Sequence, residues 1–313
     1  MITLAFCYWV AGIMFAIFAI ITAFDSSNAK RWTSAMFWAL LATSFLAGDY
    51  LGDLGNGLLV LGLLGIAGTG QLGKGAQPGA SEADKRAQAA MRGNRIFLPA
   101  LIIPAVALIG TLAFKHWPTI ADPKQATLIA LAFGVLITLA ACLAWLRPGL
   151  ATPFRDGHRL MEQVGWAAIL PQMLASLGAV FAAAGVGQAV GGVIGGAIPH
   201  GSLLGAVIVY GLGMALFTIV MGNAFAAFPV MAGAIGVPIL IHQQGGDPAV
   251  IAAIGMLAGF CGTLMTPMAA NFNLVPAALL ELKDRYGVIR MQIGTAVPML
   301  IVNIAFIYWF GFR

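Results

Sequence analysis

Residues 259–276 read Gly259-Phe-Cys-Gly-Thr-Leu-Met-Thr-Pro-Met-Ala-Ala-Asn-Phe-Asn-Leu-Val-Pro276. The run is apolar enough to lie in a bilayer, but Thr266-Pro267 and the two asparagines at 271 and 273 interrupt it. Pro267 removes a backbone donor and disfavours helix at Thr266, and Pro276 repeats the effect. We therefore expect a membrane helix that is broken within the bilayer.

A broken membrane helix has a strong physical consequence. Backbone released from a helix cannot face lipid, where each unpaired polar group costs several kcal/mol, so it has to line a cavity enclosed by protein. Discontinuous helices build the binding sites of membrane transporters in this way. The alternative is a Pro-kinked packing helix whose amide side chains bond to neighbouring helices. The two asparagines and the second proline favour the broken helix.

The composition is that of a polytopic all-α membrane protein. Of the 313 residues 60% are hydrophobic and only 9% are charged, and the mean hydropathy is +0.94, which excludes a soluble globular domain. The net charge of +5 comes from basic residues in a few loops, so it reports topology and does not indicate nucleic acid. Cys7, Cys142 and Cys261 lie in apolar segments without pairing or metal-ligand spacing, so we expect buried thiols.

The hydropathy pattern predicts six helices before a glycine-rich centre. A spanning helix needs about 20 apolar residues, and segments of that kind lie at 3–24, 33–51, 57–72, 96–114, 125–146 and 160–184. Basic residues gather in the loops 25–32, 73–95 and 147–159, which fall on one side if every helix crosses once. That side should be the cytoplasm, so both chain termini are expected outside a cell membrane.

These segments divide the chain into four predicted parts. The loop at 73–95 is glycine-rich and charged, and we expect it to be a flexible connection. The parts are N-terminal membrane helices at 1–72, a cytoplasmic loop at 73–95, scaffold helices at 96–184 and a functional core at 185–313.

The core is expected to begin with an interfacial arm and a hairpin. The arm, 185–202, is too rich in glycine to span comfortably, and two apolar runs follow it at about 203–221 and 224–240. They join at Gly222-Asn223 without a polar loop, which favours the buried tip of a re-entrant hairpin. Two full crossings, or one long tilted helix, remain alternatives. The broken helix at 249–283 and a last helix at 291–310 complete the chain.

The candidate binding residues are therefore uncharged. Between Gln163 and Leu280 the only formally charged side chain is Asp247, in a predicted outer turn. Proton-coupled transporters usually place acids or histidine in the membrane, so sodium is the more suitable coupling ion. Helix N-termini and exposed carbonyls could hold an anion and a small cation. The predicted substrate site contains Gly222, Asn223, Ala224, Thr266, Pro267, Asn271 and Asn273, with a sodium ion near Asn223 and Thr266.

Motifs for an enzyme are absent from the sequence. There is no His-Glu-x-x-His, Gly-x-Ser-x-Gly or phosphate-loop pattern, and no pair of intramembrane acids. The four histidines are far apart in sequence. We expect no catalytic residue and no organic cofactor.

Three stretches carry a resemblance to a known family: Thr152-Pro-Phe-Arg-Asp-Gly-His-Arg-Leu-Met-Glu-Gln-Val-Gly-Trp166, Leu170-Pro-Gln172, and Cys261 to Glu281. They resemble the larger membrane subunit of a two-subunit bacterial permease family identified with 5-oxoproline (pyroglutamate) transport. More distantly, residues 150–313 are similar to one repeat of the ion transporter superfamily, in which a hairpin with a Ser-Asn-Thr tip precedes a helix broken at a Thr-Pro-like motif. Here Gly222-Asn223-Ala224 replaces the tip, and only Asn223 matches it.

The resemblance implies a sodium-coupled secondary transporter for a small organic anion such as 5-oxoproline. The superfamily uses two inverted repeats, and residues 1–150 do not repeat the hairpin and break, so it also implies a smaller membrane subunit carrying the second repeat in a hetero-oligomer. The alternatives are a scaffold subunit that does not transport, a passive channel and, less favoured by the sequence, a membrane enzyme.

Overall fold

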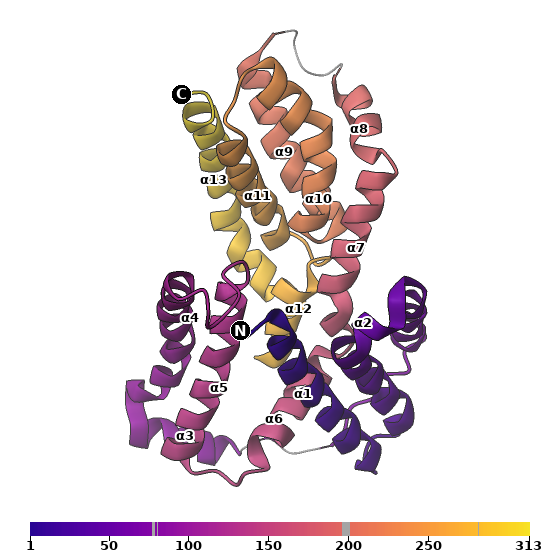
Figure 1. The fold of residues 1–313 in the computed structure, drawn as a ribbon, viewed down its shortest axis with the longest axis vertical. Coiled ribbons are helices and arrows are strands. Elements are labelled where there is room, and N and C mark those ends of the chain that lie inside the picture. The colour runs from indigo at the N-terminus through magenta and orange to yellow at the C-terminus, as the bar shows by residue number, and fades with distance from the viewer. Residues whose placement is uncertain (77–78, 80, 196–200, 281) are drawn as a thin grey trace. The chain divides into compact units, whose positions relative to one another are not determined.

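The computed structural model describes residues 1–76, 79, 81–195, 201–280 and 282–313. The described chain is helical throughout, without a strand, and seven of its helices are long and apolar enough to span a membrane. This confirms the prediction of an all-α polytopic membrane protein. The chain divides into two compact units, residues 1–162 and 163–313, which are described separately (Figure 1).

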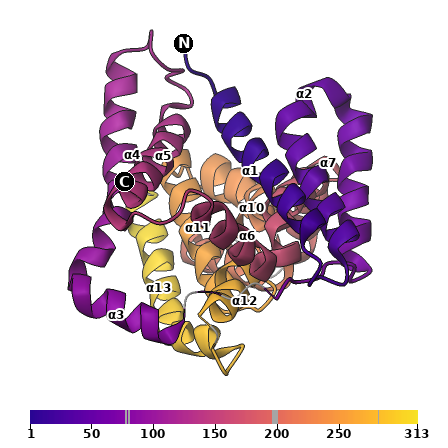
Figure 2. The ribbon, with the colours of Figure 1, turned by 90° about the horizontal axis from the view of Figure 1, so that it is seen from below.

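Unit 1 is built from helical hairpins. Its long helices are α1 (Leu4–Phe24), α2 (Arg31–Gly68), α4 (Leu98–His116) and α5 (Ala126–Leu146). Helix α2 is bent into two limbs at Gly52. The φ angle of Gly52 is 62°, which is incompatible with a right-handed helix. The limbs are antiparallel, since Lys30 before the first limb donates through Nζ to the carbonyl of Gly70 after the second (2.6 Å; Figure 2). Two helices, at 33–51 and 57–72, were predicted here, and the bend at Gly52 confirms that the chain divides between them.

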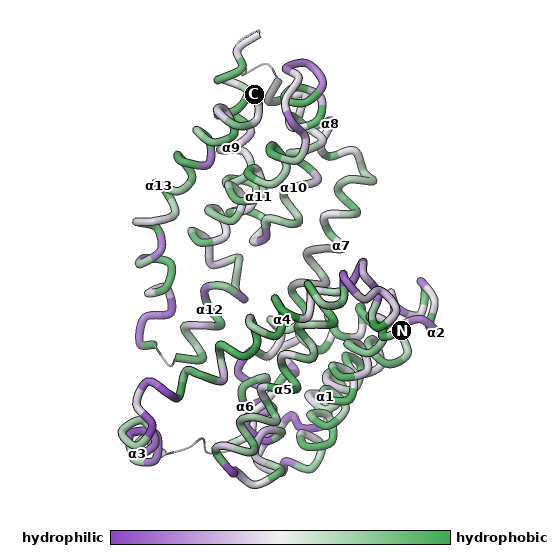
Figure 3. Tube along the Cα trace, turned by 60° about the vertical axis from the view of Figure 1, so that its left-hand side comes forward, coloured by the Kyte–Doolittle hydropathy of each residue, from purple (hydrophilic) through white to green (hydrophobic). Residues whose placement is uncertain are grey.

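The segment expected to be a flexible loop at 73–95 contains a helix. Helix α3 (Glu82–Arg92) begins where the Ser81 hydroxyl accepts a hydrogen bond from the Asp84 amide (3.1 Å). A serine in this position stabilises a helix start by satisfying a backbone donor. A 3₁₀ turn, η1 (Gly93–Phe97), then leads into α4. Figure 3 shows that α3 is hydrophilic and α4 hydrophobic. The prediction of a loop was therefore wrong for the residues of α3, while the predicted polar character of this segment was right.

The expected spanning helix at 160–184 is also wrong. Helix α6 (Thr152–Val164) is a short amphipathic helix, and it ends at Gly165, whose φ is 56°. A 3₁₀ turn, η2 (Gly165–Ile169), follows, and α7 (Leu170–Ala183) restarts with a proline at its N-terminus. The left-handed glycine explains the interruption, because a helix cannot pass through a residue with positive φ.

Unit 2 contains the two helices that were predicted to join at Gly222-Asn223, and both are long and apolar enough to cross a membrane, so the re-entrant form stays a prediction. Helix α9 (Leu203–Met221) runs to the tip at Gly222-Asn223, and α10 (Ala224–Met231) returns along it and continues as a π-helix, η3 (Ala232–Gln243). The expected arm forms α8 (Val186–Gly195), bent from α7 by 67°. Gly191 brings α8 against the backbone of Ala234 in η3. The rest of the arm, 196–200, lies outside the described residues.

The last three helices show where the break lies. Helix α11 (Pro248–Leu264) ends before residues 265–269, α12 (Ala270–Leu279) follows, and α13 (Gly287–Phe310) runs antiparallel to α11 (Figure 1). The amide of Asp247 donates to Gly311 (2.7 Å), and Asn303 donates through Nδ2 to Sγ of Cys261 (3.5 Å). The break begins one helical turn beyond Cys261, so it follows closely on this contact between α11 and α13. The predicted interruption of the helix is confirmed, and its depth in a bilayer stays a prediction.

The hairpin tip gives the first prediction. Gly222 has a φ of 77°, and a Cβ on it would lie 2.6 Å from the Met268 carbonyl oxygen. Gly222→Ala should therefore lower the stability of the folded protein by about 1–3 kcal/mol, because it adds backbone strain and a clash. Gly294→Ala is the matched control, since nothing lies within 4 Å of its Cβ. Thermal unfolding in detergent measures both, and equal melting temperatures would contradict the prediction.

Candidate functional site

The hairpin tip and the helix break meet in unit 2. Oγ1 of Thr266 in the break donates to the carbonyl oxygen of Ile219 in the last turn of α9 (2.8 Å) and accepts from the Met268 amide (3.2 Å). Gly222 lies against the Met268 backbone, so closely that only a glycine fits. The structure thus brings together the two segments that the sequence predicted to face each other.

Four helix ends converge at this meeting point, which we call the tip–break site (residues 218–225 and 263–273). Helices α9 and α11 end there, and α10 and α12 begin there. Helix ends carry unpaired backbone groups and partial charges, negative where carbonyls end a helix and positive where amides begin one. The site therefore offers both signs of partial charge within one small region.

Asn223 is the N-cap of α10. Its Oδ1 accepts a hydrogen bond from the Phe225 amide (2.7 Å), and the residue is 6% exposed. The next residue, Ala224, is buried and lies beside Gly259 of α11. Asn223 therefore starts α10 at the tip, and its Nδ2 has no hydrogen bond within the described part of the chain.

Asn273 fastens the break from the other side. Its Nδ2 donates to the carbonyl oxygens of Thr263 (2.8 Å) and Thr266 (2.7 Å), and the side chain is fully buried. The sequence suggested an unwound segment at 266–273, but α12 already begins at Ala270. The Asn273 amide donates to carbonyls that are left unpaired at the end of α11, and this allows α12 to begin at Ala270.

Asn271 and Asn273 share one feature, since Oδ1 of each is buried and has no hydrogen-bond partner among the described residues. They differ at Nδ2, which in Asn273 donates to two carbonyls of the break. Pro267 is exposed on the surface of the break, beside Met268, whose exposed fraction is 60%. Helix α12 has no side-chain cap at its N-cap, Ala269. Near Asn271 the site thus keeps hydrogen-bonding capacity that the chain itself does not use.

The described residues include no group of three or more His, Cys, Asp or Glu side chains suited to a metal ion. A small cation at the tip–break site would have to be held by carbonyl oxygens, either Oδ1 of Asn271 or the second lone pairs of backbone carbonyls that already accept one hydrogen bond. Oxygen ligands of this kind suit hard cations.

Sequence reasoning missed a second polar cluster, in unit 1. Nε2 of His158 lies 2.7 Å from Oγ1 of Thr22, and Oε1 of Glu162 lies 3.6 Å from the same Nε2. Glu162 also accepts from Nδ2 of Asn28 (3.4 Å) and from the Gly75 amide (3.1 Å). His158 and Glu162 are buried, so α6 is tied by polar side chains to the end of α1 and to the loop before α3.

The charges in this cluster are shifted by burial. Burial lowers the pKa of the His158 imidazole, partly opposed by the negative charge of Asp25. Burial raises the pKa of the Glu162 carboxyl, while the hydrogen bond from the Gly75 amide lowers it. A signal was present in the sequence, because His158 and Glu162 are four residues apart and so share one face of α6. Because their hydrogen-bond partners are distant in sequence, this spacing alone could not predict the cluster.

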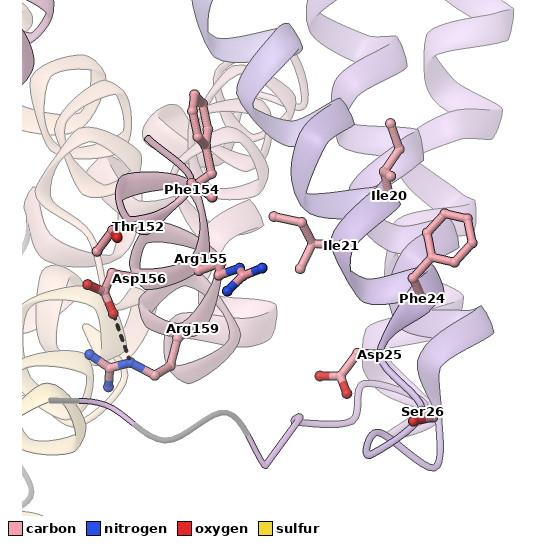
Figure 4. A pocket seen from close by; sticks show the side chains of 11 residues that line it. Ile20, Ile21, Phe24, Asp25, Ser26, Thr152, Phe154, Arg155, Asp156 and Arg159 are labelled. Carbon is pink, nitrogen blue, oxygen red and sulfur yellow. Dashed lines mark ion pairs between the residues drawn. The ribbon is translucent and has the colours of Figure 1, made fainter. Parts of the chain in front are cut away.

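Beside this cluster, α1 and α6 form an open pocket of about 750 Å³. In Figure 4, Arg155 extends from α6 toward Ile21 of α1, and Arg159 pairs with Asp156 (3.7 Å). Two arginines and two aspartates line the pocket, so their formal charges cancel. The pocket is therefore less suited to selecting an anion than its arginines alone would suggest.

The fold defines a class: a multi-pass helical membrane protein with a hairpin tip set against a broken helix. The chain belongs to the family described as "Protein of unknown function (DUF979)", which matches residues 5–312. No curated protein and no solved structure matches the chain.

The two asparagines of α12 give a prediction that separates structure from function. Asn273→Ala should lower stability by about 2–3 kcal/mol, because two buried carbonyls lose their donor. Asn271→Ala should change stability little, because its Oδ1 has no partner to lose. Thermal unfolding of both variants in detergent measures the difference. Equal losses would show that Asn273 does not hold the break together.

Proposed function

We propose that the chain is a subunit of a secondary active transporter for a small organic anion, with the tip–break site as its binding site. One observation carries the proposal: a hairpin tip and a helix break meet, joined by the hydrogen bond from Thr266 to the Ile219 carbonyl. Backbone without helical pairing is tolerated at membrane depth only where it faces protein or water. Inverted-repeat transporters place substrates and ions at such points.

The chemistry of the site supports an anion as substrate. The amides that begin α10 and α12 favour negative charge, and the amide side chains of Asn223 and Asn271 can orient a carboxylate. Between Gln163 and Leu280 no charged side chain competes at the site, since Asp247 is the only one there and it caps α11 at the far end from the break.

The identity of the substrate and of the coupling ion is the finer part of the proposal. A carboxylate with a neutral amide group, such as 5-oxoproline, suits a site of backbone amides and asparagines. The carbonyl ends of α9 and α11 suit sodium, near Asn223 and Thr266. The resemblance of residues 152–166 and 261–281 to the 5-oxoproline permease family points to the same pair.

The proposal includes a partner subunit. In the described part of the chain, the tip and break of unit 2 have no counterpart in unit 1, which consists of α1 to α6. An inverted-repeat transporter completes its site from a twin repeat, so a smaller membrane subunit would supply it. The basic loops favour one orientation in a cell membrane, with both termini outside, which disfavours a self-paired inverted dimer.

Uptake measurements test the site. Asn223→Ala and Asn271→Ala should abolish concentrative uptake of labelled 5-oxoproline by cells or vesicles, because they remove the groups that orient the carboxylate, while the amount of protein in the membrane stays unchanged. Gluconate, citrate and a sodium-free medium are the comparisons. Uptake with unchanged kinetics in both variants would refute the site, and changes in abundance alone would favour a scaffold.

The partner is tested separately. The chain is expressed alone and together with the membrane protein encoded beside it, and uptake and native mass are measured. Uptake is expected only from the co-expressed pair, together with a mass that includes both chains. Full transport by the single chain would refute the two-subunit proposal.

A further inference from the structure

Unit 2 contains a cavity of about 280 Å³ beside α12. Five α12 residues line it, with residues of α6 and η2 opposite: Ala270, Leu274, Val275, Ala277 and Ala278 on α12, and Gln163, Val164, Trp166 and Ala167 opposite. Its size lies near the lower end of the range for small-molecule sites, ~300–1,000 Å³. We call it the α12 cavity.

The α12 cavity extends from the break to a basic segment. Ala270 is the first residue after the break, and Ala278 lies eight residues further, about 12 Å along the helix. Beyond the end of α12, Leu282 and Arg285 also line the cavity. The small side chains at 270, 277 and 278 leave the space open, so one face of α12 connects the tip–break site with Arg285.

Two polar groups stand in this otherwise apolar lining. Oε1 of Gln163 is buried and has no hydrogen-bond partner among the described residues. Arg285 is exposed and makes no ion pair with any residue that the structure describes, whereas the nearby Arg290 holds Asp284 (3.0 Å). A buried acceptor without a donor costs free energy unless water or a ligand supplies one. The cavity is therefore suited to water and to a molecule that carries negative charge.

We propose that the α12 cavity is a water-filled passage through which a small carboxylate moves between the tip–break site and the side of the basic segment 282–290, and that Arg285 binds the carboxylate at its opening. The inference rests on the proposed function, because the carboxylate is the substrate proposed there. Arg285 attracts the anion by its charge, and the apolar lining beyond it gives no second charge that would retain the anion.

The passage is tested by thiol labelling of the full chain in native membranes, after Cys7, Cys142 and Cys261 are replaced by alanine. Leu274→Cys lines the cavity, and Phe272→Cys is the matched control, because it is absent from the lining and lies about 200° around the helix. Methanethiosulfonate reagents react with thiolates, which form in water and not in lipid. Applied to inside-out vesicles, impermeant reagents should label Leu274→Cys and leave Phe272→Cys unlabelled.

The charge of the reagent tests Arg285. In the Leu274→Cys protein, Arg285→Gln should slow labelling by the anionic sulfonatoethyl reagent about fivefold, the factor one unit charge supplies in a water-like medium, and should not slow the cationic trimethylammonioethyl reagent. If Leu274→Cys does not assemble, Ala278→Cys at the opening replaces it.

Two outcomes would overturn the inference. Labelling of Leu274→Cys no faster than of Phe272→Cys would show that the cavity is closed to water. An unchanged ratio of anionic to cationic labelling in Arg285→Gln would remove the role of that arginine. Labelling as expected, combined with normal uptake by Asn223→Ala, would support the passage and refute the proposed binding site, so the two failures are distinguishable.

Discussion

The hydrogen bond from Thr266 to the Ile219 carbonyl holds the centre of unit 2 together. It joins the last turn of α9 to the break after α11, at a point where neither segment can complete its own backbone pairing. A lipid environment supplies no hydrogen bonds, so such segments persist only when they satisfy each other. Gly222 allows the approach, since a side chain there would meet the Met268 backbone. The break and the tip therefore depend on each other.

Asn273 and Asn271 show how such a site divides its amides between structure and chemistry. Asn273 donates both of its side-chain N–H groups to carbonyls of the break. These two hydrogen bonds hold the backbone in place where it is not helical. Asn271 lies two residues away and about 200° around α12. Its Oδ1 is buried without a hydrogen-bond partner, as is that of Asn273, but no carbonyl of the break depends on its side chain. The unused capacity of Asn271 is meaningful because Asn273 already holds the break in place.

The sequence predicted the break, the hairpin tip and their meeting, because Thr266-Pro267 and Gly222-Asn223 are local signals that act through backbone geometry. It did not predict the separate functions of Asn271 and Asn273, which depend on carbonyls up to ten residues away. The prediction of a spanning helix at 160–184 was wrong because a single glycine, Gly165, adopts a left-handed conformation. The pattern of apolar residues does not reveal that conformation. The His158–Glu162 cluster depends on residues more than 80 positions distant.

In a site composed of helix ends, most of the hydrogen-bonding groups are insensitive to amino-acid substitution. Carbonyls and amides belong to the backbone, so no substitution except one by proline, which lacks the amide hydrogen, can delete them. The side chains around them can change while the hydrogen-bonding groups remain. Relatives of this chain could therefore diverge widely at 218–225 and 263–273 and retain the same arrangement of donors and acceptors. What substitution can change is the position of those groups, through glycine at the tip and asparagine in α12. Selectivity would then evolve through spacing, and not through replacement of the groups that touch the ligand.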